Sequence, residues 1–138
     1  MYKRDFLDME EASIAVKAVI TEASKDPSQP IAVAVVDSYG ELIYYAKMDD
    51  SAPLFGHMAI KKAFTAAGFR RSTREVKSSM QGWQLELASW DDDRNTNIPG
   101  GVCIKKPDGT PLGGIGVSGR LPDEDEALSN VGLKAINL

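Results

Sequence analysis

The sequence predicts an α+β fold in which antiparallel strands pack against helices. The apolar pattern gives, in order, a helix, a strand pair, helices, a second strand pair and a final helix. A short polar turn joins the strands of each pair, which makes them antiparallel hairpins rather than parts of β-α-β units. The chain has 138 residues, of which 43% are hydrophobic and 26% charged. This composition is typical of one globular domain spanning residues 1–138 with an ordinary core.

The first half of the chain predicts one helix and one hairpin. Apolar residues at three- and four-residue spacing indicate a helix over residues 8–25, and Asp8 with Glu11 forms the pattern of a capping box. The stretch "IAVAVVD" is apolar on both faces, which is typical of a central strand. The turn "DSYG" then leads into "ELIYYAKM", which we expect to be the second strand.

The second half predicts helices around another hairpin. We expect a helix over residues 54–69 with a stripe of alanines, a partly helical stretch over residues 72–90, and a loop at "RNTNIPGG". The strands "GVCIKK" and "PLGGIGVSG" flank the turn "PDGT". Pro122 and the acidic residues that follow it suit the first turn of a closing helix, "PDEDEALSNVGLKAI".

The net charge and the cysteine content argue against several kinds of partner and against disulfide or metal sites. Sixteen basic and twenty acidic residues give a net charge of −4, which argues against nucleic acid or an anionic membrane as partner. The start of the chain has no apolar segment typical of a signal peptide. The single cysteine, Cys103, cannot form an internal disulfide, and no cysteine or histidine cluster has metal-ligand spacing. We therefore expect a cytoplasmic location and no metal site.

The stretch "GGIGVSG" matches the dinucleotide-binding pattern G-x-G-x-x-G at Gly114, Gly116 and Gly119. That pattern binds a pyrophosphate only between a strand and a helix of a parallel β-α-β unit, whereas these glycines lie in a predicted hairpin near the end of the chain. Since side chains alternate along a strand, Gly114 and Gly116 leave one face of it bare. This bare face packs against the alanine stripe of the second helix, or part of it forms the floor of a ligand pocket, and both are compatible because a helix covers only part of a sheet.

Four sequence blocks together resemble the GlcG/HbpS family, which includes the C-terminal domain of PduO-type proteins. They are "IAVAVVDSYGELIYYAKMDD", "AIKKAFTA", "IPGG" and "GGIGVSGRLPDEDEA", in this order. The resemblance implies a profilin-like antiparallel sheet of about five strands with helices on both faces. It also implies a homo-oligomer. Some members bind haem, which makes haem a candidate cofactor, and others accompany catabolic operons.

The chain also departs from this family pattern. Some relatives carry a haem-ligating histidine in the first helix, and residues 8–25 contain none. Asp50 stands where glycine is common, and "QLELASWDDDRNTN" resembles a specialised insert. The positions that match the family and are candidates for ligand binding are Thr65, Pro99, Gly100, Gly101, Gly114, Gly116 and Ser118.

Three side chains are candidates for catalysis. His57 is the only histidine, and histidine is the common general base near neutral pH. On a helical wheel it lies nearly opposite the alanine stripe, so a surface position is the alternative. Lys62 is either an anion clamp or one half of an ion pair with Asp37, Asp49 or Asp125. Asp49 is a second candidate base. The N–H groups of "IPGG" either form an oxyanion hole or belong to a glycine turn.

Two functions follow from these residues. The first is a small-molecule-binding domain of GlcG/HbpS type, which takes haem or a related organic ligand. The second is a cofactor-free catabolic enzyme, an isomerase, lyase or hydrolase, acting on a small carbonyl or carboxylate compound. A structural or interaction subunit is a third alternative.

Overall fold

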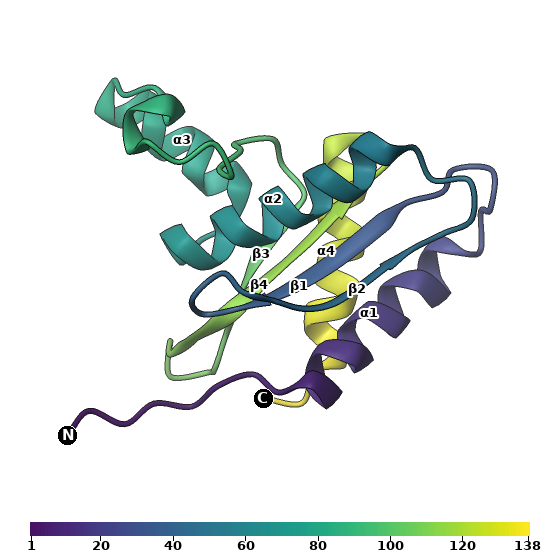
Figure 1. Cartoon of the computed structure of the whole chain (residues 1–138), viewed down its shortest axis with the longest axis horizontal. Coiled ribbons are helices and arrows are strands. Elements are labelled where there is room, and N and C mark those ends of the chain that lie inside the picture. Colours follow the sequence, from purple (N-terminus) through teal and green to yellow (C-terminus); the bar gives the residue numbers. More distant parts are fainter.

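The computed structural model describes residues 1–138, and its helices and strands follow the predicted order (Figure 1). Each regular element lies within about two residues of its predicted range, and the predicted capping box of Asp8 and Glu11 is present. None of the helices has the length and apolar character needed to span a bilayer. The elements are α1 (Met9–Ala23), β1 (Ala32–Asp37), β2 (Leu42–Lys47), α2 (Pro53–Phe69), α3 (Thr73–Trp83), a short 3-10 helix (Leu87–Trp90), β3 (Gly101–Lys105), β4 (Pro111–Ser118) and α4 (Pro122–Ala135).

The sheet contains four strands in the order β2-β1-β4-β3, and every neighbouring pair is antiparallel. This confirms the two hairpins and the four strands that the residue pattern predicts. The family resemblance implied about five strands, and that number is wrong for this chain. Residues 84–97 form the 3-10 helix and loops, as the expectation of partial helix and loop for this part of the chain indicated.

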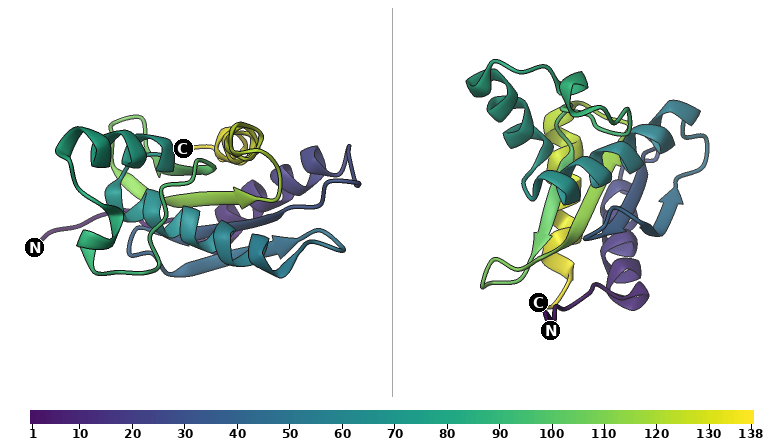
Figure 2. Two further views of the ribbon diagram at one scale, coloured as in Figure 1. Left: turned by 90° about the horizontal axis from the view of Figure 1, so that it is seen from above. Right: turned by 60° about the vertical axis from the view of Figure 1, so that its left-hand side comes forward.

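Helices cover both faces of the sheet, as the resemblance implied (Figure 2). On one face, α1 and α4 enclose the larger apolar core, which includes Val33 and Val35 of β1 and Ile115 and Val117 of β4. On the other face, α2 packs on the small residues of the same strands. The alternation of side chains along a strand therefore separates a core of branched side chains from a thin layer of alanine and glycine.

The bare face of β4 is the surface on which α2 lies. A Cβ added to Gly114 would overlap the carbonyl oxygen of Ala63, and one added to Gly116 would overlap that of Ala59. The helix backbone thus contacts the strand backbone directly, and no space for a ligand remains above these two glycines. The packing alternative holds here, and the floor of a ligand pocket must lie elsewhere. Because β4 pairs with antiparallel strands only, the glycines form no dinucleotide loop.

This close contact makes a stability prediction. We expect Gly116→Ala to lower the free energy of unfolding by about 3 kcal/mol, because its methyl group meets rigid backbone. Gly68 lies on the exposed side of α2 with no heavy atom near its Cβ position. There Gly68→Ala should stabilise the protein by about 0.5–1 kcal/mol through helix propensity. Urea unfolding followed by circular dichroism measures both, and equal effects of the two substitutions would contradict the packing described.

Candidate functional site

Helix α2 has one face on the sheet and one face toward solvent. Pro53 starts it, with a fixed φ that suits the first helical turn, and Arg70 ends it in the left-handed conformation. Between these ends, the alanine stripe and Lys62 are buried against the sheet. The opposite face presents His57, Ile60, Lys61 and Phe64, at spacings of three and four residues. The outward position of His57 that the helical wheel predicts is confirmed.

The predicted ion pair of Lys62 is present, and Asp125 of α4 is its partner. Each side chain is 2% exposed, and Lys62 Nζ donates to Asp125 Oδ2 at 3.1 Å and to the carbonyl of Val117 at 2.9 Å. The backbone N–H of Arg120 donates to Asp125 Oδ1 at 3.0 Å. Burial lowers the pKa of Lys62 and raises the pKa of Asp125, while their mutual attraction opposes both shifts. With its charge paired and shielded from solvent, Lys62 does not clamp a ligand in this structure.

The glycine pair of "IPGG" lies directly beside Lys62. Gly100 has a φ of 135°, and a Cβ there would lie 2.7 Å from Lys62 Nζ. Its carbonyl accepts hydrogen bonds from Ser129 Oγ at 2.6 Å and from the N–H of Val117 at 3.2 Å. The N–H of Gly101 donates to Thr73 Oγ1 at 3.0 Å. Since one of the two proposed donors is already bonded, this loop is built as a buried turn and not as an oxyanion hole.

Thr65 holds the chain after the 3-10 helix against α2. Its Oγ1 donates to the carbonyl of Lys61 at 2.8 Å and accepts from the N–H of Thr96 at 2.8 Å. Thr65 is fully buried, so its hydroxyl binds backbone and not a ligand. The bond fixes residues 94–96 beside the outer face of α2.

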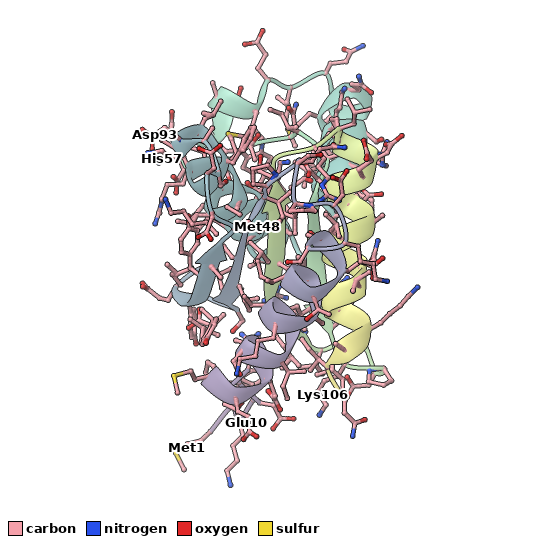
Figure 3. The ribbon with its side chains drawn as sticks, turned by 90° about the vertical axis from the view of Figure 1, so that its right-hand side faces the viewer. Met1, Glu10, Met48, His57, Asp93 and Lys106 are labelled. Carbon is pink, nitrogen blue, oxygen red and sulfur yellow. The ribbon has the colours of Figure 1, made fainter.

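A surface hollow of about 280 Å³, which we call the α2 hollow, opens at this place. Residues 57–64 of α2 form its floor, the hairpin turn after β1 forms one wall, and Arg94 forms another. Figure 3 shows His57 at the outer surface of α2, well away from Met48. The residues that line the α2 hollow are Gly40, His57, Ile60, Lys61, Phe64 and Arg94.

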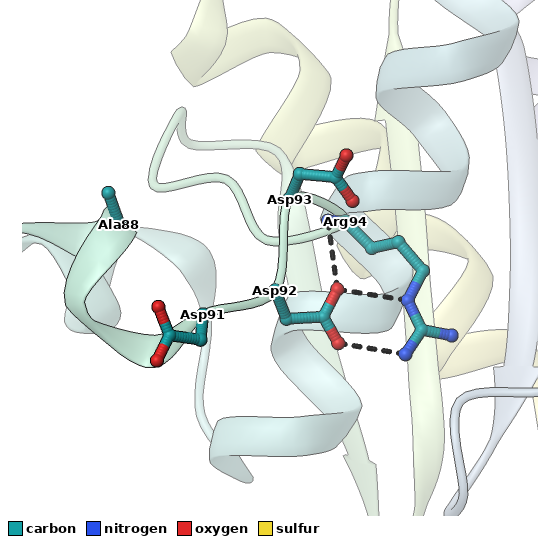
Figure 4. Close-up of a pocket in the computed structure, with 5 residues that line it drawn as sticks. All are labelled: Ala88, Asp91, Asp92, Asp93 and Arg94. Carbon is teal, nitrogen blue, oxygen red and sulfur yellow. Dashed lines mark hydrogen bonds and ion pairs between the residues drawn. The ribbon is translucent and has the colours of Figure 1, made fainter.

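Arg94 is held in a defined orientation at the edge of the α2 hollow. Its Nε and Nη2 donate to the two carboxylate oxygens of Asp92 at 3.0 and 2.8 Å (Figure 4). Its guanidinium carbon lies 4.2 Å from the centre of the Phe64 ring, within the range of a cation–π contact. The hydrogen bond to Asp92 is the main cause that raises the pKa of Arg94 above its usual value. The guanidinium therefore stays charged. Its Nη1 atom makes no hydrogen bond within the chain.

The predicted catalytic residues do not come together. Asp49 lines a separate hollow with Met48 and Ile20, while His57 lines the α2 hollow and Lys62 is buried between α2 and α4. Ser118 is buried at the end of β4 opposite Ala32, and Pro99 is half-buried in the loop before β3. No three His, Cys, Asp or Glu side chains gather where they could hold a metal ion.

Sequence reasoning found His57 in the α2 hollow but missed its neighbours Ile60, Lys61, Phe64 and Arg94. A signal was present for the first three, because they follow His57 at three, four and seven residues on one helical face. Arg94 lies within the stretch identified as an insert. Nothing in the sequence indicates that this stretch folds back on α2.

A family model described as "Haem degrading protein HbpS-like" matches residues 7–134. The chain belongs to the HbpS-like family. It is 30% identical to GlcG of Escherichia coli K12 over 118 residues, which are 86% of this chain and 85% of GlcG. It is 28% identical to the corrinoid adenosyltransferase PduO of Citrobacter freundii over 134 residues, which are 96% of this chain. That match spans only 39% of PduO, so this HbpS-like chain corresponds to part of a longer protein there.

Solved structures of the family share the fold. A double mutant of HbpS from Streptomyces reticuli superposes with a TM-score of 0.88 at 27% identity, covering all of this chain and 92% of that one. The crystal structure of a PduOC–haem complex gives a TM-score of 0.84 at 25% identity, covering 96% of each chain. The fold is thus retained at low sequence identity.

The buried pair generates the second prediction. Lys62→Met leaves the buried carboxyl of Asp125 without its cation, so that it is either charged and unpaired or forced to take up a proton, and we expect a loss of about 3–5 kcal/mol in the free energy of unfolding. The double variant Lys62→Met with Asp125→Leu removes both charges and should recover most of that loss. Guanidinium unfolding of the two variants measures the difference. A double variant no more stable than the single one would contradict the assignment of this cost to the unpaired carboxylate.

Proposed function

We propose that this chain is a small-molecule-binding domain whose ligand lies in the α2 hollow. One observation supports this site above the others. Among the five main surface hollows, it alone has no carboxylate side chain in its lining, and its charged members are Lys61 and Arg94. Apolar walls with a few polar groups at one side are typical of ligand sites.

Haem is the ligand class that the relatives support, through the description of the family and the PduOC–haem complex. Iron needs a side-chain donor that is free to bind it. The first helix of this chain offers no histidine, and the sulfur atoms of Met48 and Met80 already accept hydrogen bonds from the N–H of Ile31 and from Trp90 Nε1. Met58 of α2 is half-buried and does not line the α2 hollow. His57 is exposed and makes no hydrogen bond within the chain, so its ring nitrogens are free.

The residues of the α2 hollow fit a haem-like ligand in their chemistry. Ile60 and the uncovered part of Phe64 would supply apolar surface for a flat ring, His57 would supply a nitrogen ligand, and Lys61 and Arg94 would pair with the ring's carboxylates. Haem, when bound, would supply the redox-active iron. This chain would hold the ring, orient it through its carboxylates and offer the His57 nitrogen as a ligand.

One copy of the chain encloses a flat ligand only in part, because the α2 hollow of about 280 Å³ is open to solvent on one side. We include in the proposal that a second copy covers the ligand, as a homo-oligomer would. The reducing cytoplasm remains the proposed location, since a chain with a single cysteine, Cys103, forms no internal disulfide.

A cofactor-free enzyme built on the predicted residues has no geometric support. General acid–base catalysis requires its groups within hydrogen-bond reach of one substrate. Here Asp49 and His57 lie in different hollows, and Lys62 is sealed in its pair with Asp125. We therefore set this alternative aside.

Titration with haemin tests the proposal. We expect an absorbance change in the Soret region on binding, and a weakening of about tenfold or more in His57→Ala, because the nitrogen ligand is lost. Met48→Leu is the matched control, since its sulfur already serves the backbone, and it should bind haemin as the parent protein does. Native mass spectrometry of the purified protein would report the oligomer and any retained ligand.

Two results would contradict the proposal. Identical haemin spectra and affinities in the parent protein and His57→Ala would exclude His57 as the ligand. Absence of haemin binding together with no retained organic molecule would remove the ligand-binding function itself.

A further inference from the structure

The α2 hollow contains three polar side chains with unused bonding capacity. Arg94 Nη1, Lys61 Nζ and the imidazole of His57 make no hydrogen bond or ion pair within the chain. Each of them can donate a hydrogen bond, and two of them carry a fixed positive charge. An unpaired group of donors beside apolar walls indicates a ligand that brings acceptors and an apolar body together.

The carboxylates near Arg94 do not fill this role. Asp92 bonds Nε and Nη2, on the side of the guanidinium away from Nη1 (Figure 4). Asp93 and Glu41 act on Arg94 only through their charge, and no hydrogen bond joins them to it. Asp92 thus restrains the Arg94 side chain. A guanidinium held by two parallel hydrogen bonds loses little further conformational freedom when it binds an acceptor.

The Asp92–Arg94 pair is itself held against helix α2. The ring of Phe64 supports the guanidinium from below, and the bond from the Thr96 N–H to Thr65 Oγ1 ties down the chain two residues after Arg94. Lys61, one helical turn after His57, supplies the second donor from α2. The 91–94 segment therefore completes a site whose other half is the outer face of a rigid helix.

The geometry points to a site that selects ligands with a carboxylate next to a flat apolar body, and to Arg94 as the residue that selects them. This inference rests on the proposed function, since it concerns the same hollow. It goes further because binding through Arg94 needs no iron. A free aromatic acid and a porphyrin are then recognised by the same contact between their carboxylate and Arg94. The acceptor oxygens of the ligand bind Arg94 Nη1 and Lys61 Nζ, and its ring lies on Ile60, beside the Phe64 ring that the guanidinium covers.

A matched pair of probes tests this selection. 2-Naphthoate and 2-naphthamide share shape and ring but differ in charge, and NMR titration of ¹⁵N-labelled protein follows the amides of Gly40, Ile60 and Phe64. We expect 2-naphthoate to shift these amides and to bind about fivefold more tightly than the amide, as suits a partly exposed ion pair. The variant Arg94→Gln should weaken 2-naphthoate alone and so narrow this difference, of which Lys61 retains a part. Lys77→Gln, at an exposed cation on α3 outside the α2 hollow, is the control and should change neither affinity.

The outcomes separate this inference from the proposed function. Equal affinity for the two probes, equal weakening of both by Arg94→Gln, or no binding of either probe overturns the selection by Arg94. If haemin still binds through His57 in any of these cases, the proposed function stands and only the carboxylate selection fails. Arg94 is largely exposed, at 66% of its side chain, so the variant should fold, and its melting temperature checks this.

Discussion

The direct contact between the backbones of α2 and β4 determines the rest of this structure. It exists because Gly114 and Gly116 have no side chains on the face that α2 covers. A helix normally lies about 10 Å from a sheet, with side chains filling the gap. Here the layer between them is mostly alanine and glycine, with Val36 and Phe55 as larger members, so the helix has little room to rotate or slide. The orientation of every side chain on α2 follows from this fit.

The fixed orientation divides neighbouring residues of one helix between different roles. Lys61 and Lys62 are adjacent in sequence, yet one lies at an open hollow and the other is buried with Asp125. The buried lysine also lies against Gly100, whose carbonyl bonds Ser129 of α4. Lys62 therefore connects α2 with the end of β4 and with α4. This connection lies beside the "IPGG" loop. Its contribution is to the architecture that holds the hollow.

Much of the fold could be predicted from sequence because it depends on local pattern. Apolar periodicity located the helices, turn residues located the hairpins, and the capping box located the start of α1. The unusual residue Asp50 adopts a φ of 64°, the left-handed conformation in which glycine is favoured, which accounts for the family's glycine there. The family resemblance gave the helices on both faces but overstated the number of strands.

The site was harder to predict, because it depends on contacts between distant segments. The alternation of strand residues left two uses open for Gly114 and Gly116, and only the position of α2 decided between them. Three carboxylates were possible partners for Lys62, and the topology brought only Asp125 to it. Arg94 reaches Phe64 across thirty residues of chain, through an irregular segment without periodicity. No helix or strand pattern encodes such a contact.

The separation of the two faces of α2 has an evolutionary consequence. The residues that hold the helix against the sheet admit almost no change, whereas the exposed side chains of His57 and Ile60 contribute little to the core and can vary at small cost in stability. New binding preferences could therefore arise by drift on the outer face while the framework stays intact. Relatives that share this framework at under a third identity need not share a ligand.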